Sequence, residues 1–239
     1  MSKITFNRPR HKIVRKALAL LQPEFLERSQ CYFGGGTRIV LALGEYRESE
    51  DIDFLCSSRD GYRALRSTVT SASLGKIAAP TAKLAREVMA DRYGIRTFLD
   101  VDGSKVKFEI VNEGRIDVSG GDDAGLAVPA LDEQSCFAEK FLANADRWAD
   151  ESVLSRDVID LAFMMESWDP DVAARGYALA CAAYGDLTAD CAKHAARKLL
   201  DDKAYLKRCV ESLRVTETGR LASGLRKIAA GRWNPKPAK

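Results

Sequence analysis

Tyr32-Phe33-Gly34-Gly35-Gly36-Thr37, followed after a short apolar run by Arg47-Glu48-Ser49-Glu50-Asp51-Ile52-Asp53-Phe54, is the stretch on which the fold prediction rests. Residues 30–33 predict a short strand that enters a glycine turn. We expect Thr37 to cap the apolar helix that follows, which ends near Gly44. The alternation at 51–56 then predicts a second strand, with Asp51 and Asp53 on one face. The stretch therefore predicts a compact βαβ-like unit.

The residue types in this unit are those of a nucleotide and metal site. A glycine turn at a helix start exposes backbone N–H groups that favour phosphate, so Gly35, Gly36 and Thr37 are the predicted phosphate ligands. Two carboxylates on one strand face, joined by a third from a neighbouring strand, can hold two Mg²⁺ ions for displacement at phosphorus. Ser49, two residues before Asp51, is expected on the same face in contact with phosphate or water.

The third carboxylate is sought on the next predicted strands. Asp102-Gly103 separates two alternating runs, 95–101 and 105–111, which is a strong hairpin signal. Glu109 on the second run is the first candidate. Asp100 and Asp117 stay open as alternatives, because either could also lie beside the first pair.

The rest of the chain predicts an α+β protein. The pattern indicates a first helix at 11–21 and mainly helix from 61 to 92. Residues 119–125 form the best linker, closed by Pro129, and no strand is predicted beyond it. Helices are predicted at 132–148, 153–168, 171–184, 188–201, 203–213 and 217–230, before a frayed tail at 233–237.

We therefore expect two domains, a mixed sheet with flanking helices at 1–128 and an all-helical part at 129–239 that completes an active-site cleft. Of 239 residues 46% are hydrophobic, enough for a buried core. No apolar run reaches the ~18 residues of a membrane span, so the expected location is cytoplasmic. Six scattered cysteines argue against disulfides. Cys191 and His194 are interpreted as two residues of one helix, not as a zinc site.

The charge is polarised along the chain. Six basic and no acidic residues precede Glu24, and six basic and no acidic residues follow Glu217, so the interior carries −9 within a total of +3. Basic ends suit a nucleic-acid partner, because phosphates attract Lys and Arg with little regard to sequence. Two solvated, solubilising termini are the equally weighted alternative.

These motifs also carry a family resemblance. The glycine-threonine turn and the Arg-x-Ser-x-Asp-x-Asp run resemble the first motif of the DNA polymerase β type nucleotidyltransferases, and more closely the AbiEii/AbiGii toxin family. Later counterparts occur in order: Lys107-x-Glu109, Glu139-Lys140, Arg147, and Ser155-Arg156-Asp157-x-x-Asp160. The resemblance covers about residues 30–168. Thr37 stands where many of these enzymes have Ser, and Glu109 where many have Asp.

The second half contributes charged groups on apolar helices. Residues 153–165 are apolar around most of the predicted helix, with Arg156, Asp157 and Asp160 within one arc. Buried charges need partners, so a functional role is weighed against a simple Arg156 to Asp160 pair one turn apart. Lys140 is either a snorkelling surface lysine or a phosphate ligand.

The resulting hypothesis is a metal-dependent nucleotidyl transfer. Asp51, Asp53 and Glu109 hold Mg²⁺ or Mn²⁺, and Lys140 neutralises pyrophosphate as it departs from the nucleoside triphosphate. Asp157, Asp160 and Arg156 orient Lys140 or the acceptor.

The family resemblance implies an RNA acceptor such as the 3′ end of tRNA, and a growth-arresting toxin restrained by a cognate antitoxin. An enzyme that modifies a small molecule or a protein, and a non-catalytic binding module, are the alternatives.

Overall fold

The computed structural model describes residues 6–123 and 125–233. The chain divides into two compact units. Met1–Leu41 and Ser49–Asp132 make up the first, here named the sheet unit, and Ala42–Glu48 and Glu133–Lys239 make up the second, the helical unit. None of the helices in the described ranges has both the length and the hydrophobicity needed to cross a bilayer.

The sheet unit contains a mixed sheet, as predicted. Its strands are β1 Cys31–Gly34, β2 Ile52–Cys56, β3 Lys83–Leu84, β4 Met89–Ala90, β5 Gly94–Val101, β6 Ser104–Asn112, β7 Gly120–Asp122 and β8 Pro129–Leu131. Their spatial order is β3-β5-β6-β2-β1-β8-β7, and β4 pairs with β5. β2 runs antiparallel to β1 but parallel to β6, which places Asp53 of the Asp-x-Asp motif and the Lys107-x-Glu109 motif on adjacent strands.

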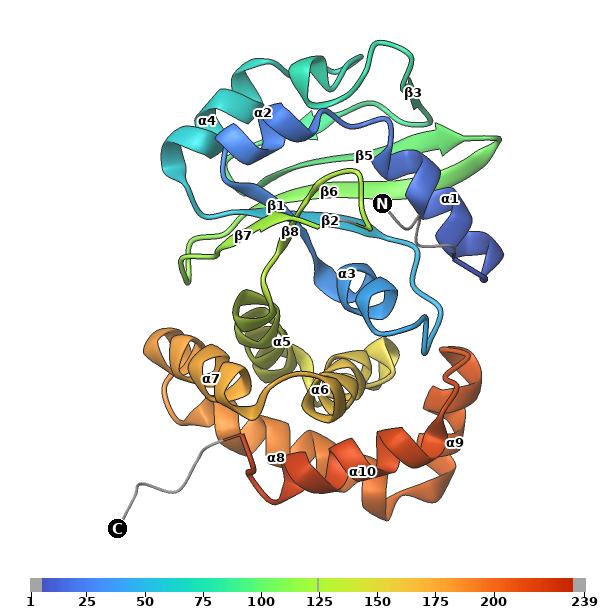
Figure 1. Ribbon diagram of the computed structural model, residues 1–239, viewed down its shortest axis with the longest axis vertical. Coiled ribbons are helices and arrows are strands. Elements are labelled where there is room, and N and C mark those ends of the chain that lie inside the picture. Colours follow the sequence, from blue (N-terminus) through green and yellow to red (C-terminus); the bar gives the residue numbers. More distant parts are fainter. Residues whose placement is uncertain (1–5, 124, 234–239) are drawn as a thin grey trace. The chain divides into compact units, whose positions relative to one another are not determined.

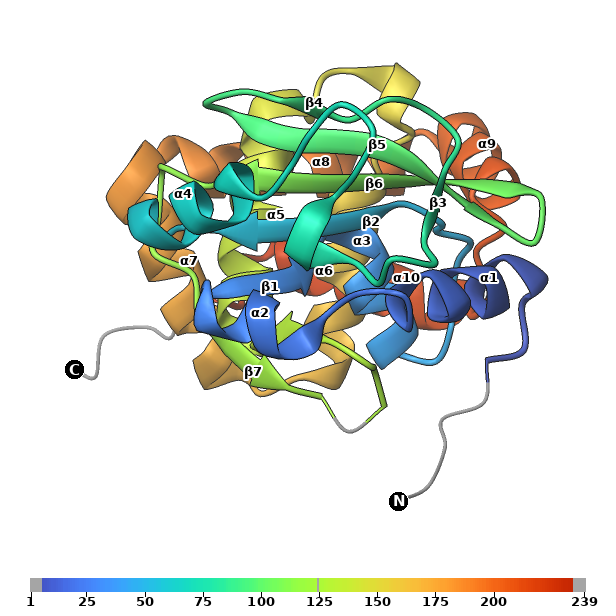
Figure 2. The same ribbon diagram turned by 90° about the horizontal axis from the view of Figure 1, so that it is seen from above.

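Helices α1 Pro9–Leu18, α2 Pro23–Arg28 and α4 Arg59–Ser67 lie on one face of this sheet (Figures 1 and 2). The main core of the unit lies between these helices and the strands, and Phe54 and Phe108 are fully buried in it. Because side chains alternate along a strand, residues such as Asp53 point to the opposite face. The helix α3 Gly35–Ala42 follows β1 directly, without a loop.

In the part of the sheet unit that follows β2, the structure contradicts two predictions. Mainly helix was expected at 61–92, but α4 ends at Ser67, and a 3-10 turn and the short strands β3 and β4 follow. β3 and β4 take their hydrogen bonds from β5, so a neighbouring strand overrides the local helical spacing. No strand was expected after the linker, yet β8 pairs parallel to β1 and antiparallel to β7. The hairpin at Asp102-Gly103 is confirmed, and both turn residues have positive φ, 53° and 78°.

The helical unit contains all six predicted helices. They are α5 Glu133–Arg147, α6 Arg156–Ser167, α7 Pro170–Tyr184, α8 Leu187–Asp201, α9 Lys203–Ser212 and α10 Thr218–Ala229. α6 and α10 cross very closely, because a Cβ at Gly224 would lie 2.1 Å from the carbonyl oxygen of Ala162. Cys191 and His194 both lie on α8, and the six cysteines are free thiols.

The prediction of a frayed tail is wrong at its first residue. Trp233 is 1% exposed and packs against Phe141 and Tyr177, with ring centroids 5.4 and 5.7 Å away. A large apolar ring that can reach the helical core is more stable inside it than in water. The remainder of the predicted tail, 234–237, lies outside the described residues.

Candidate active site

Strand pairing brings Asp53 and Glu109 together. Gly34 on β1 is the partner of Asp53 on β2, and Asp53 is in turn the partner of Glu109 on β6. Residues paired across adjacent strands project from the same face of the sheet. The two carboxylates therefore lie side by side, directly beside the glycine turn, on the face opposite the core helices.

The same register separates the alternative carboxylates from this place. Asp100 pairs with Lys105, four residues along β5 from Arg96, the partner of Glu109. At ~3.3 Å per residue that is about 13 Å away. Asp117 is exposed in the connection after β6. Of the three candidates, Glu109 is the one that β6 places next to Asp53.

The glycines allow the backbone to approach these carboxylates. Gly35 has φ +66°, and a Cβ there would lie 2.7 Å from Asp53 Oδ2. A Cβ at Gly34 would lie 2.4 Å from a methyl group of Leu55. Any larger residue would push Asp53 or the core aside. The start of α3 consequently lies in contact with a carboxylate, with Gly35 and Gly36 half-buried at its first two positions.

Thr37 and Ser49 form one contact of the site. Thr37 was expected to cap the helix, but α3 already begins at Gly35, so the capping prediction is wrong. The Thr37 hydroxyl lies 2.8 Å from the Ser49 hydroxyl instead. The Ser49 amide donates to Nε2 of the buried His11. Ser49 and Asp51 precede β2 and are not part of it, unlike the predicted strand, and both are half-buried.

Two cations hold the carboxylate pair. Lys107 Nζ lies 2.8 Å from Glu109 Oε2 and 3.8 Å from Asp53 Oδ1. Arg96 Nε lies 2.7 Å from Glu109 Oε1. Burial raises the pKa of Glu109, but the hydrogen bonds and charges of Lys107 and Arg96 outweigh it and lower the pKa below its usual value. Glu109 is therefore ionised at neutral pH.

The donor set fits a divalent cation. Carboxylate oxygens are the ligands that Mg²⁺ and Mn²⁺ prefer, and the Lys107 ammonium already lies between the two carboxylates. Among the described residues no group of three or more His, Cys, Asp or Glu side chains is arranged as a metal site. Asp53 and Glu109 thus form the pair that the structure brings together, and Asp51 stands just before it in the chain.

The helical unit contains a buried charge network centred on Asp160. This carboxylate is 0% exposed and accepts hydrogen bonds from both Nε and Nη2 of Arg47, at 2.7 and 2.8 Å. The Tyr46 hydroxyl donates to it at 2.6 Å, and Lys140 Nζ lies 2.7 Å from its Oδ2. Burial raises the pKa of Asp160, but Arg47 and Lys140 outweigh it and lower the pKa.

Asp157 extends this network by one turn of α6. It accepts from Lys140 Nζ at 2.9 Å and from Arg147 at 2.6 and 3.0 Å. The charges of Lys140 and Arg147 lower its pKa against the effect of burial. Lys140 is 5% exposed, so it is not a snorkelling surface lysine.

Arg156 stands apart from the network that it was predicted to join. It is half-buried and forms no ion pair with any described residue, so the alternative of a simple Arg156 to Asp160 pair is wrong. Asp160 is satisfied from within its own unit by Arg47 and Tyr46, from a segment 113 residues earlier. Arg47 was predicted only as part of a motif, and no role was predicted for Tyr46. The requirement that a buried carboxylate have a partner was the signal that could have found them.

Two solved structures are similar in fold to this chain. A solved structure from Helicobacter pylori, titled JHP933, aligns over 95% of both chains with TM-score 0.55 and 14% identity. A candidate nucleotidyltransferase from H. pylori aligns over 93% of this chain and 94% of its own, with TM-score 0.51 and 13% identity. At such identities the likeness shows a shared fold. No curated protein sequence matches significantly.

The sequence profile described as nucleotidyl transferase AbiEii toxin, type IV TA system, matches residues 18–221. That range contains the glycine turn, the carboxylate pair and the buried charge network. The chain belongs to the AbiEii family of nucleotidyltransferase toxins of type IV toxin–antitoxin systems.

Proposed function

We propose that this chain transfers a nucleoside monophosphate from a nucleoside triphosphate to a hydroxyl of RNA, with the 3′ end of tRNA as the acceptor. The observation that carries the proposal is the pairing of Asp53 with Glu109 beside Gly35. Membership of the family implies a nucleoside triphosphate substrate and a cognate antitoxin. The transfer of label to RNA, described below, is the experiment that tests the acceptor.

In the sheet unit, Asp51, Asp53 and Glu109 would hold Mg²⁺ or Mn²⁺. When bound, the metal lowers the pKa of the acceptor hydroxyl and offsets charge on the triphosphate. Gly35, Gly36 and the Thr37 and Ser49 hydroxyls would position the phosphates through N–H and O–H donors. Arg96 and Lys107 keep Glu109 ionised, which a ligand carboxylate requires.

In the helical unit, Lys140 would neutralise charge on pyrophosphate. Its two carboxylate contacts, Asp157 and Asp160, act as positioning groups, because they fix the ammonium and keep it protonated: burial lowers the pKa of Lys140, but the charge of Asp160 outweighs burial and raises it. Arg156 has no partner in the described chain and is a candidate to bind nucleotide phosphate.

The test is incorporation of label. The purified protein is incubated with each α-labelled nucleoside triphosphate and Mg²⁺, with total RNA, with purified tRNA or without acceptor. Asp53→Ala serves as the inactive comparison. Label in tRNA with the intact protein alone supports the proposal.

Other outcomes contradict it in distinct ways. Label on the protein itself indicates a protein-modifying enzyme, and label on a small molecule indicates an antibiotic-type transferase. Absence of label with every nucleotide and acceptor indicates a binding module on the same fold. A truncation that tests the basic C-terminus must begin after Trp233, because that residue is part of the core.

A further inference from the structure

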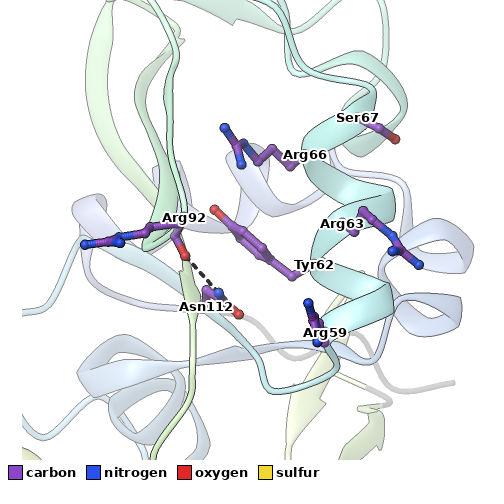
Figure 3. Close-up of a pocket in the computed structure, with 7 residues that line it drawn as sticks. All are labelled: Arg59, Tyr62, Arg63, Arg66, Ser67, Arg92 and Asn112. Carbon is purple, nitrogen blue, oxygen red and sulfur yellow. Dashed lines mark hydrogen bonds between the residues drawn. The ribbon is translucent and has the colours of Figure 1, made fainter.

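An open groove of about 580 Å³ lies beside α4, within the sheet unit. Figure 3 shows Tyr62 and Arg66 pointing from α4 toward Arg92 and Asn112, which lie across from the helix. Arg59 lines the same groove one turn earlier on α4. Neither Asp53 nor Glu109 lines it, so this groove is separate from the carboxylate pair.

The groove carries a surplus of positive charge. Arg59 and Arg66 are exposed and form no ion pair with the described residues, and Arg92 is exposed as well. A fourth arginine of the lining, Arg63, is paired with Asp60 at 2.7 Å. Tyr62, which lies between these arginines, is neutral at pH 7 and adds no charge; burial raises its pKa further, to about 12. The guanidinium groups of Arg59 and Arg66 lie beside the groove, and that of Arg92 extends away from α4 to the Tyr93 ring, so together they form a positively charged path for an extended polyanion (Figure 3).

An aromatic ring stands beside these arginines. Tyr93 is 58% exposed, one of few large apolar side chains so exposed in the described chain. The Arg92 guanidinium lies 4.5 Å from its ring centroid and donates a hydrogen bond to its hydroxyl. Asp91 Oδ1 accepts from the amides of Tyr93 and Gly94, which fixes this turn. An exposed ring beside arginines is typical of surfaces that stack unpaired bases while binding phosphates.

The groove is tied to the carboxylate pair through the β5–β6 hairpin. The Tyr62 hydroxyl donates to the Asp91 carbonyl at 2.6 Å, and the Asp91 carboxylate lies 3.4 Å from Arg96, which holds Glu109. Asn112 donates to the Arg92 carbonyl and stands three residues after Glu109 on β6, about 10 Å along the strand. The Asn112 side chain points to the face that α4 covers, opposite to Glu109, so a strand bound in the groove reaches the carboxylates only by passing around the sheet.

We propose that the groove lined by Arg59, Arg66 and Arg92, together with the adjacent exposed ring of Tyr93, binds a single-stranded polynucleotide, a segment of the RNA acceptor. Phosphates contact the arginines, and one base stacks on Tyr93. That the bound strand is an acceptor rests on the proposed function, whereas its binding does not.

The test measures binding of a fluorescently labelled single-stranded RNA of about 12 nucleotides by anisotropy, at salt concentrations between about 50 and 200 mM. Arg59→Ala/Arg66→Ala should weaken binding and reduce the slope of log K against log salt by about 1.4, since each phosphate contact contributes about 0.7. Tyr93→Ala should weaken binding about fivefold or more and leave the salt slope unchanged.

A matched control removes two positive charges elsewhere. Lys83 and Lys105 are exposed and both pair in register with Asp100, at the opposite end of the hairpin. Lys105 is seven residues from Asn112 on β6, about 23 Å away. Lys83→Ala/Lys105→Ala should leave affinity and slope nearly unchanged. The proposal is overturned if the groove variants keep the affinity and salt slope of this control. That outcome would favour an acidic protein as the partner of this surface.

The comparison of ligands separates the remaining possibilities. Tighter binding of the corresponding RNA duplex would overturn the single-stranded assignment, and equal binding of single-stranded DNA would support a site that reads phosphate and base without the 2′-hydroxyl. If the groove variants lose RNA binding but the intact protein labels no RNA, the groove proposal is supported and the proposed function is contradicted. If the protein labels RNA and the groove variants leave the KM for RNA unchanged, the groove proposal alone is contradicted.

Discussion

Gly35→Ala tests how the chain brings its backbone against the carboxylate pair. Gly35 has φ +66°, and an added Cβ would lie 2.7 Å from Asp53 Oδ2 and 3.0 Å from Asp53 Cβ. Gly103 is the matched control, because its φ is +78° but an added Cβ meets nothing within 4 Å. Left-handed backbone costs alanine about 1–2 kcal/mol at both positions. Displacing Asp53 adds about 1–3 kcal/mol at Gly35 alone.

We therefore expect Gly35→Ala to lower the free energy of unfolding by about 2–5 kcal/mol and Gly103→Ala by about 1–2 kcal/mol. Urea unfolding followed by circular dichroism measures the difference. Tryptophan fluorescence is unsuitable, since Trp148, Trp168 and Trp233 all belong to the helical unit.

The double variant Gly35→Ala/Asp53→Gly isolates the contact. Compared with Asp53→Gly, it should lose only the backbone contribution, because the clashing side chain is gone. Equal losses for Gly35→Ala and Gly103→Ala, or no recovery in the double variant, would refute the close approach of Gly35 to Asp53.

Three further predictions concern the helical unit. Arg47→Met should destabilise the protein by about 3 kcal/mol or more in urea, because it leaves Asp160 buried with fewer partners, whereas Arg156→Met should stay within about 0.5 kcal/mol; equal effects would contradict the network. Asp157 and Asp160 have lowered pKa values when folded, so their stabilisation is present above pH ~4 and is lost as pH falls further. Asp157→Asn should reduce the loss of unfolding free energy at acid pH. An unchanged loss would contradict the ionic role of Asp157 in the network. Trp233→Ala should cost about 3–5 kcal/mol and lower the melting temperature, and an unaltered melting curve would place Trp233 outside the core.

Local sequence signals predicted the parts of the fold that local physics decides. Asp102-Gly103 supplies the two positive φ angles of a tight hairpin turn, so β5 and β6 were predictable to within a residue or two. The helices of the second half follow from apolar spacing and caps, such as Asp169, whose side chain accepts from the Asp171 amide. These features depend on residues close in sequence.

The errors fall where distant segments decide. β8 consists of three residues that form a strand because β1 and β7 lie on either side of them. Leu84 and Val88 have helical spacing and Met89 follows them, but Leu84 and Met89 pair with β5 as strand residues. No local pattern distinguishes these outcomes, because the competing hydrogen bonds come from elsewhere in the chain.

The candidate site shows the same division. The residue types and order of the motifs located Asp53 and Glu109, but only the register between β2 and β6 separates Glu109 from Asp100. Helical spacing offered Arg156 as a possible partner of Asp160, whereas Arg47 takes that place from a segment remote in sequence. A prediction made from the residues of one helix cannot identify a partner that lies in a distant segment.

The assignment of the catalytic carboxylates is tested most directly by comparing Glu109→Gln with Asp100→Asn in the labelling assay. Both changes remove one negative charge from the same hairpin, and asparagine can still accept from the Gly103 amide. Loss of a metal ligand removes several kcal/mol of transition-state stabilisation, so Glu109→Gln should lower the rate of label transfer about a hundredfold or more. Asp100→Asn should transfer label at the wild-type rate. Full activity of Glu109→Gln, or its loss in Asp100→Asn alone, would contradict the account.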